Sequence, residues 1–374
     1  MKPAKITGII FLMLMVVLPY AVKAADTIKI GALMGFTGAY RSSHIHTFRA
    51  IQMAVDELNE KGGVLKHRIE LVKLDNKSSL LGSRQAAKTA VKKNILAVIG
   101  AVRSSNSIAA APIFQAAGII MITPTSTNPR VTLLGDYIFR TCYTDLTQGR
   151  VLANFAFDEL SLKTAVVLTN AGNKYSMDLA GYFIDRFRAR GGRLLWEGDY
   201  LDRVSDFDLL IEKTKRMNPE VIFVPGYSQD AGQIVKKGRE LGITATFIGG
   251  DGWDELIYRY AGNAINNCFH SAFWHPDLPS KKNRVFVNHY REKYGKIKRF
   301  DIAGAYDAVM VFSRAVKKAG CLEPFKIKLA MYSMDNYKGA SGNIKFDKNG
   351  DTTKPVVIIK YINNQSFYLK SILP

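Results

Sequence analysis

Two adjacent hydroxyl side chains stand where a predicted strand is followed by a predicted helix. Ser104 and Ser105 come after the β-branched run at 96–100 and before or within a helical period near 107–117. The first turn of a helix presents unpaired backbone N–H groups and the positive end of the helix dipole, so it favours anions. The pair therefore predicts a site for a ligand carboxylate. The alternative is that Ser104 or Ser105 is only the N-cap of this helix, which needs no ligand.

A second polar loop follows the next predicted strand. It reads Thr-Pro-Thr-Ser-Thr-Asn-Pro at 123–129, so Thr125 and Thr127 lie between two prolines that keep the backbone out of a helix. A rigid loop rich in hydrogen-bonding groups suits ligand capture. A polar surface turn would have the same composition.

Aromatic and acidic side chains occupy equivalent places later in the chain. Tyr175 and Tyr227 each follow a predicted strand, and Asp251 follows a third, close to Trp253. Ligands of open α/β sheets bind outside the carboxyl ends of the strands, so a carboxylate there could face an ammonium group and the tyrosines could cover the ligand. Asp251 could instead belong to a turn, and each tyrosine to core packing.

The sequence gives little support to catalysis. It has no phosphate loop, no GxSxG motif and no dinucleotide-binding fingerprint. The histidine pairs His44 with His46 and His270 with His275 lack same-face helical spacing and a third ligand nearby, so packed or surface histidines are the favoured interpretation. We therefore expect no enzyme, no cofactor and no metal site.

The elements that must position these residues alternate along the chain. Strands are predicted at 28–34, 69–74, 96–100, 119–122, 137–141 (a connecting strand), 165–169, 194–200, 221–224, 246–249 and 268–273. Helices are predicted at 46–61, 107–117, 174–190, 207–216, 230–241, 281–294 and 302–319. Such alternation implies parallel sheets covered by helices, in two lobes, with the last two helices returning to the first lobe.

The N-terminus has the pattern of a secretory signal peptide. Lys2 and Lys5 precede an apolar run at 9–18 and small residues around a cut after Ala24, so we predict a signal peptide at 1–24 and a periplasmic protein. No cysteine follows the run to accept a lipid anchor, and no later apolar stretch is long enough to span a membrane.

Charge and cysteine content narrow the class of protein further. The formal net charge of the 374 residues is +20, but the basic residues are scattered, which favours a solvated surface over a nucleic-acid partner. Cys142, Cys268 and Cys321 allow at most one disulfide, and buried inert thiols are the favoured alternative.

Across nearly all of the mature chain, the sequence resembles the branched-chain amino acid (leucine/isoleucine/valine) binding proteins of ABC importers. The matching segments include Lys-Ile-Gly at 29–31, Gly-Phe-Thr-Gly at 35–38, Asp-Glu-Leu-Asn-Glu-Lys-Gly-Gly at 56–63, Thr-Asn-Pro at 127–129, Phe-Arg-Thr at 139–141, Thr-Asp at 144–145 with Gln-Gly at 148–149, and Gly-Asn-Ile-Lys-Phe-Asp at 342–347. The resemblance implies a type I periplasmic binding protein of class α/β, with two doubly wound parallel-sheet lobes joined by a three-segment hinge. On that basis we predict lobe one at 25–142 plus 276–347 and lobe two at 143–275 plus 348–374.

The resemblance also implies roles for the candidate residues. Ser104, Thr125 and Thr127 match positions that hold the ligand carboxylate. Asp251 matches the partner of the amino group, and Tyr175 and Tyr227 match the covering tyrosines. We also keep Ser105 as a candidate.

The chain departs from the resembled family at three places. Ser78 and Arg103 occupy the two positions where those proteins carry a disulfide. Ser43 occupies a position where they carry a tyrosine, and Tyr40 lies close by in the sequence. Arg103 could contact a second acid on the ligand or point to solvent.

The expected role is capture without chemistry. An amino acid, branched-chain or otherwise apolar, would bind a monomeric protein and pass to an inner-membrane permease with its ATPase. The alternative is a sensor that binds another small carboxylate, amide or aromatic acid and signals to a membrane receptor.

Overall fold

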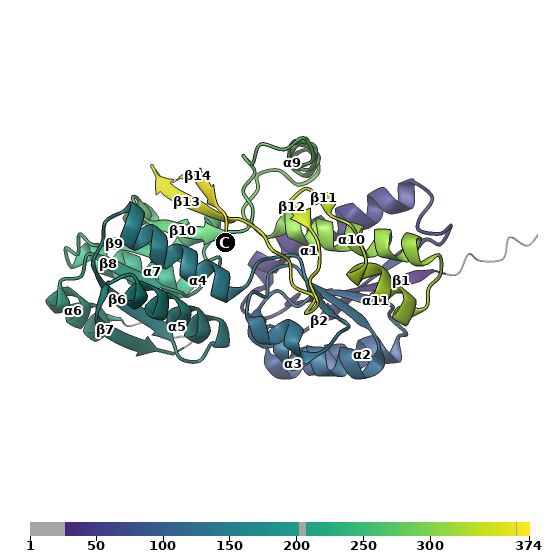
Figure 1. Cartoon of the computed structure of the whole chain (residues 1–374), viewed down its shortest axis with the longest axis horizontal. Helices are drawn as coiled ribbons and strands as arrows, with labels where there is room; N and C mark the ends of the chain where they lie inside the picture. The colour runs from purple at the N-terminus through teal and green to yellow at the C-terminus, as the bar shows by residue number, and fades with distance from the viewer. Residues whose placement is uncertain (1–26, 202–206, 364) are drawn as a thin grey trace, which may run out of the picture.

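The computed structural model describes residues 27–201, 207–363 and 365–374. The predicted signal peptide lies outside these residues. The described chain forms two sheets, each flanked by helices, and a small hairpin of β11 (Tyr337–Gly339) and β12 (Gly342–Ile344). Figure 1 shows the two sheets with their helices as separate halves of an elongated molecule. We call them the first and second lobes.

The first sheet has the order β2-β1-β3-β4-β5, and all of its pairs are parallel. Its strands are β1 (Ile28–Met34), β2 (Ile69–Asp75), β3 (Ala97–Gly100), β4 (Ile120–Thr123) and β5 (Ile138–Arg140). Every strand predicted in this region is present, with bounds within two residues. β5, expected as a connecting strand, pairs with β4 and completes the edge of the sheet.

The helices around the first sheet are α1 (Arg41–Glu60), α2 (Leu80–Lys92), α3 (Ser104–Ala117), α9 (Lys281–Tyr294), α10 (Ile302–Ala319) and α11 (Pro324–Tyr332). α1 begins five residues before its predicted start, and α2 and α11 were not predicted. α10 packs along α1, where the Tyr306 hydroxyl donates to Glu57 Oε2 at 2.7 Å. This contact joins the C-terminal part of the chain to the first lobe.

The second sheet has the order β14-β13-β10-β9-β8-β6-β7. Its strands are β6 (Thr164–Asn170), β7 (Arg193–Tyr200), β8 (Val221–Val224), β9 (Thr246–Gly249), β10 (Phe269–Ala272), β13 (Val356–Ile362) and β14 (Gln365–Ile372). The first five are parallel, as predicted, but β13 and β14 add an antiparallel edge that the sequence analysis missed. β14 is largely exposed, so its apolar signal is weak.

Helices of the second lobe are α4 (Asp145–Asn154), α5 (Lys174–Ala189), α6 (Asp208–Met217), α7 (Ser228–Glu240) and the short α8 (Tyr258–Ala261). Short 3-10 or π segments lie at Pro129–Leu134, Phe155–Glu159, Glu255–Ile257 and Gly262–Ile265.

The chain passes between the lobes after β5, after β10 and after β12, and the yellow end of the ribbon in Figure 1 makes the last of these passages. The residue boundaries of the lobes and hinge stay a prediction.

The described residues have free thiols, no cluster of metal-ligating side chains and no helix suited to crossing a bilayer. Cys142, Cys268 and Cys321 are free thiols, the first two buried. No group of three or more His, Cys, Asp or Glu side chains in the described ranges is arranged to hold a metal ion. No helix there has the length and apolar character needed to cross a bilayer.

Candidate functional site

A cavity of about 420 Å³ lies between the two lobes. Its walls are the loops that follow β1, β2, β3 and β4 on one side and β6, β8, β9 and β10 on the other, together with the turn before α10. These loops follow the carboxyl ends of their strands, the place where parallel α/β sheets bind ligands. A volume of this size is within the range of small-molecule sites.

Five of the seven candidate residues line this cavity, and two do not. The five are Ser104, Thr125, Tyr175, Tyr227 and Asp251. Ser105 is the second residue of α3 and half-buried, and Thr127 is fully buried behind the wall, where its carbonyl accepts a hydrogen bond from Asp145 N at 2.8 Å. The cavity thus draws side chains from both lobes.

The first-lobe wall has the features of an anion site. Ser104 opens α3 and is 2% exposed, but the N-cap residue is Arg103, which makes no side-chain cap hydrogen bond. The alternative that Ser104 or Ser105 is merely the N-cap is therefore wrong. Thr125 Oγ1 donates to the carbonyl of Val102 at 2.5 Å and so ties the loop after β4 to the loop after β3. The first turn of α3 has no side-chain cap, so its N–H groups are available to an anion.

The second-lobe wall holds a carboxylate in a defined position. Gln148 Nε2 donates to Asp251 Oδ1 at 2.8 Å, and Asp251 N donates to Gln148 Oε1 at 3.2 Å. Burial raises the pKa of Asp251 to about 6, although hydrogen bonds from Gln148 and Tyr175 oppose the rise. The same Gln148 amide donates to Asp145 Oδ1 at 2.7 Å, and Ser271 Oγ donates to its oxygen at 2.8 Å.

Gln148 was not among the candidate residues. It lies on α4, the helix that follows the passage between the lobes after β5, and its only signal was the Gln-Gly sequence at 148–149 that forms part of the family resemblance. Its position next to Asp251 depends on how α4 packs against the loop after β9. Sequence spacing does not reveal that contact.

Two tyrosines form the aromatic part of the wall. The ring centroids of Tyr175 and Tyr227 lie 5.2 Å apart, with the planes tilted by 34°. Gly252 N donates to the Tyr175 hydroxyl at 2.9 Å, which ties α5 to the loop after β9. Gly250 makes this approach feasible, because a Cβ at that position would collide with the same hydroxyl.

Arg103, whose direction the sequence left open, lies in the cavity wall. Its guanidinium carbon is 3.5 Å from the ring centroid of Tyr40 and 3.4 Å from that of Tyr227. Tyr40 belongs to the loop after β1 in the first lobe, and Tyr227 follows β8 in the second. The side chain is half-buried between these two rings.

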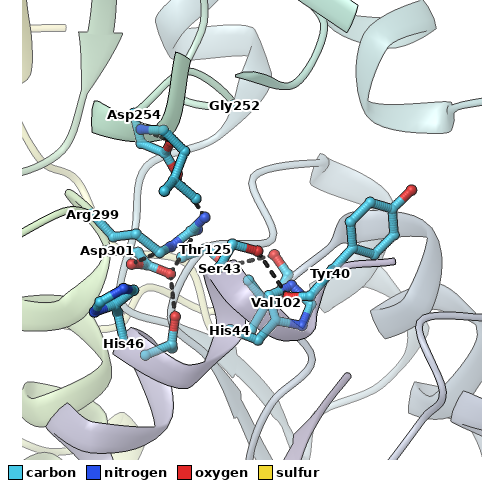
Figure 2. A network of polar contacts seen from close by, with 12 residues as sticks. Tyr40, Ser43, His44, His46, Val102, Thr125, Gly252, Asp254, Arg299 and Asp301 are labelled. Carbon is cyan, nitrogen blue, oxygen red and sulfur yellow. Dashed lines mark hydrogen bonds and ion pairs between the residues drawn. The ribbon is translucent and has the colours of Figure 1, made fainter. Parts of the chain in front are cut away.

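A further charged network, missed by the sequence analysis, closes one side of the cavity. Figure 2 shows Arg299 between two carboxylates: it lies 2.7 Å from Asp254 Oδ2 and 2.9 Å from Asp301 Oδ2. Asp301 also accepts a hydrogen bond from Thr47 Oγ1 of α1 at 2.7 Å, whereas Asp254 follows β9 in the second lobe. Arg299 therefore links the lobes. Nothing in its sequence surroundings marked it as a site residue.

The histidines near this network are packed side chains, as predicted. His44 is 4% exposed, and its Nδ1 accepts a hydrogen bond from Gly35 N at 3.0 Å. Burial, with the charges of Arg299 and Arg103, holds the pKa of His44 well below its usual value. His46 is 8% exposed.

Comparisons with known proteins agree with this architecture. Residues 27–365 match the model of the family described as periplasmic binding protein. An amino acid binding protein of Pseudomonas aeruginosa is 33% identical over 92% of each chain. A leucine binding protein of Thermotoga maritima superposes with a TM-score of 0.89 at 34% identity, covering 93% of this chain and 99% of its own.

A second solved structure gives the same result. The branched-chain amino acid transporter substrate binding protein of Streptococcus pneumoniae, in complex with isoleucine, has a TM-score of 0.89 at 27% identity and covers 93% of this chain and all of its own. The predicted fold class is confirmed. The chain belongs to the periplasmic binding protein family, has its type I fold, and is similar to the branched-chain amino acid binding proteins within it.

Proposed function

We propose that this protein is the solute-binding component of an ABC importer and captures an α-amino acid in the cavity between its lobes. One observation carries the proposal: an uncapped helix start with Ser104 and Thr125 faces, across one cavity, the carboxylate of Asp251. An α-amino acid presents a carboxylate and an ammonium group on the same carbon. The first wall suits the former and the second wall suits the latter.

The relatives support the amino-acid class. The Pseudomonas protein is named an amino acid binding protein, the Thermotoga protein a leucine binding protein, and the Streptococcus protein holds isoleucine. Capture then proceeds by closure. The first lobe fixes the carboxylate, the hinge closes, and Tyr175, Tyr227 and Asp251 cover the ligand. Contacts to both walls exist only in the closed form, so the ligand favours that form.

The remaining steps follow from the same role. The signal peptide at 1–24 exports the chain to the periplasm, where it works as a monomer and delivers its ligand to a membrane permease with its ATPase. No covalent bond changes in this cycle. We therefore assign no catalytic residue, metal or cofactor.

Replacing Asp251 by Asn tests the proposal. The variant keeps the size of the side chain but removes the charge that faces the ammonium group, so we expect amino-acid affinity to fall by about 100-fold, in line with the loss of one member of a buried charge pair. Calorimetric titration of the mature protein with a panel of α-amino acids provides the measurement.

Asp335→Asn is the matched control, because Asp335 is exposed and outside the cavity wall. It should bind as the unchanged protein does. Equal affinities for the Asp251 variant and the unchanged protein would reject the ammonium assignment. If no α-amino acid in the panel binds the unchanged protein, the proposed function is wrong.

A further inference from the structure

The cavity contains a guanidinium group with both faces covered and its edge open. Arg103 is stacked between Tyr40 and Tyr227 at 3.5 and 3.4 Å from their ring centroids. Contacts of this kind use the flat faces of the guanidinium and leave its N–H donors, which lie in the plane, for another partner. The two rings also restrict the plane of the group, so its donors are oriented when the lobes meet as they do in this structure.

No carboxylate in the described part of the chain forms an ion pair with Arg103. The carboxylates around it have other partners. Asp254 and Asp301 are paired with Arg299, and Asp230 accepts hydrogen bonds from the Tyr200 hydroxyl at 2.6 Å and from Tyr227 N at 2.9 Å. The Arg103 guanidinium partly opposes the rise that burial causes in the pKa of Asp230, but no ion pair joins the two side chains. Arg103 is therefore a cation in the cavity wall without a direct ion-pair partner in the described part of the chain.

An aliphatic ligand side chain would fit this wall poorly. Closing the cavity around a leucine side chain would remove water from a guanidinium group without giving it an acceptor, which is unfavourable. A carboxylate matches the planar fork of arginine and accepts two parallel hydrogen bonds from it. The ligand's α-carboxylate already has its own place beside Ser104 and Thr125.

We propose that Arg103 binds a second carboxylate on the ligand, so that the protein selects an acidic α-amino acid over aliphatic ones. The inference rests on the proposed function, because it assumes that the α-carboxylate and the ammonium group are held by Ser104 and Asp251. It concerns the other end of the same ligand. Selectivity then comes from Arg103, which stands at a position where the resembled branched-chain binders carry a disulfide.

Calorimetric titration of the mature protein with L-glutamate, L-aspartate, L-glutamine, L-leucine and benzoate tests the proposal. We expect glutamate or aspartate to bind most tightly, by at least about tenfold over leucine, since one charged hydrogen-bonded pair is gained. Leucine or glutamine binding as tightly as both acids overturns the inference. So does preference for benzoate, which lacks the α-amino group.

The variant Arg103→Met assigns the effect to this side chain, because methionine keeps the length and can fill the space between the rings. We expect it to lose acidic-ligand affinity by about 100-fold while leucine affinity stays the same or rises. Equal loss of glutamate and leucine binding would mean that Arg103 holds the α-carboxylate, which overturns the proposal. Arg84→Met, on the exposed side of α2, is the control and should change nothing.

Thermal melting of each variant without ligand checks folding. If Arg103→Met does not fold, the ranking of ligand affinities in the unchanged protein tests the proposal on its own. If the protein binds leucine in a way that depends on Asp251 but binds neither acidic ligand, this inference is wrong and the proposed function stands. Absence of any amino-acid binding removes both.

Discussion

At the scale of single residues, Asp251 couples ligand affinity to pH. Burial raises the pKa of its carboxyl to about 6, so at pH 7 most molecules carry the charge that faces the ammonium group. Asp145, on the other side of the Gln148 amide, has a pKa raised by burial and by the charge of Asp251. Only the ionised form of Asp251 can pair with an ammonium ion.

Affinity should therefore fall as the pH falls through 6. Bound ligand favours the carboxylate, so below that value each pH unit should weaken binding by up to about tenfold, since one pKa unit corresponds to that factor. Titrations at pH 7.5, 6 and 5 measure the trend, and Asp251→Asn should flatten it. Equal affinity at pH 5 and 7.5 in the unchanged protein would contradict the role given to the carboxylate.

Sequence position predicted five residues of the cavity wall but only part of its chemistry. Ser104, Thr125, Tyr175, Tyr227 and Asp251 all follow predicted strands, and strand ends of a parallel sheet meet at one edge. Gln148 and Arg299 lie on or before helices outside that pattern. Their contacts arise from tertiary packing, which a linear pattern does not encode.

At the scale of elements, helix α2 explains where hydrophobic periodicity fails. Its buried residues are Gly82, Ser83, Ala86, Ala87 and Ala90, all small, so no stripe of large apolar side chains marks the helix. Strands β3, β4 and β8 were easier to predict because they are apolar and buried on both faces. The C-terminal hairpin was missed for the opposite reason, since β14 is mostly exposed.

The Arg299 network joins two elements, the loop after β9 and the start of α10, and we expect it to stabilise the fold. Arg299→Met leaves Asp254 and Asp301 without their common partner, so we expect a loss of about 3 kcal/mol in the free energy of unfolding, typical of breaking a buried pair. Denaturant unfolding without ligand measures it. Because the pair spans the lobes, ligand affinity should fall as well.

The exposed pair of Lys236 with Glu240 offers a matched control on α7. Lys236→Met should change the free energy of unfolding by less than about 0.5 kcal/mol, as surface substitutions do. If both variants lose the same small amount, the Arg299 pairs do not stabilise the fold.

At the scale of the whole molecule, four buried histidines contribute to the response to acid. Burial lowers the pKa of His46 to about 4, that of His270 to about 3 and that of His275 to about 4, and it lowers the pKa of His44 as well. In the unfolded chain these rings take up protons near pH 6.5. At these four rings the unfolded state therefore binds more protons than the folded state between about pH 4 and 6.5.

The histidines therefore lower the free energy of unfolding as the pH drops below 6.5. Buried carboxyls with raised pKa values, Asp251 and Asp145 among them, act in the opposite direction, because the folded state keeps their protons to a higher pH than the unfolded chain does. Each histidine contributes a slope of up to about 1.4 kcal/mol per pH unit in that window. Denaturant unfolding at pH 7.5, 6.5, 5.5 and 4.5 measures the sum. His270→Phe keeps an aromatic ring against Tyr361 and removes one titrating group, so it should make the slope shallower. The same slope in the His270→Phe variant and in the unchanged protein would contradict the assignment.

The stack of Tyr40, Arg103 and Tyr227 has a consequence of another kind. One ring comes from each lobe, so separation of the lobes would transfer at least one phenol from a cation-covered surface to water. The near-ultraviolet spectrum of tyrosine responds to such a change of surroundings. The cavity thus contains its own optical probe of closure, and ligand occupancy can be followed without attaching a dye.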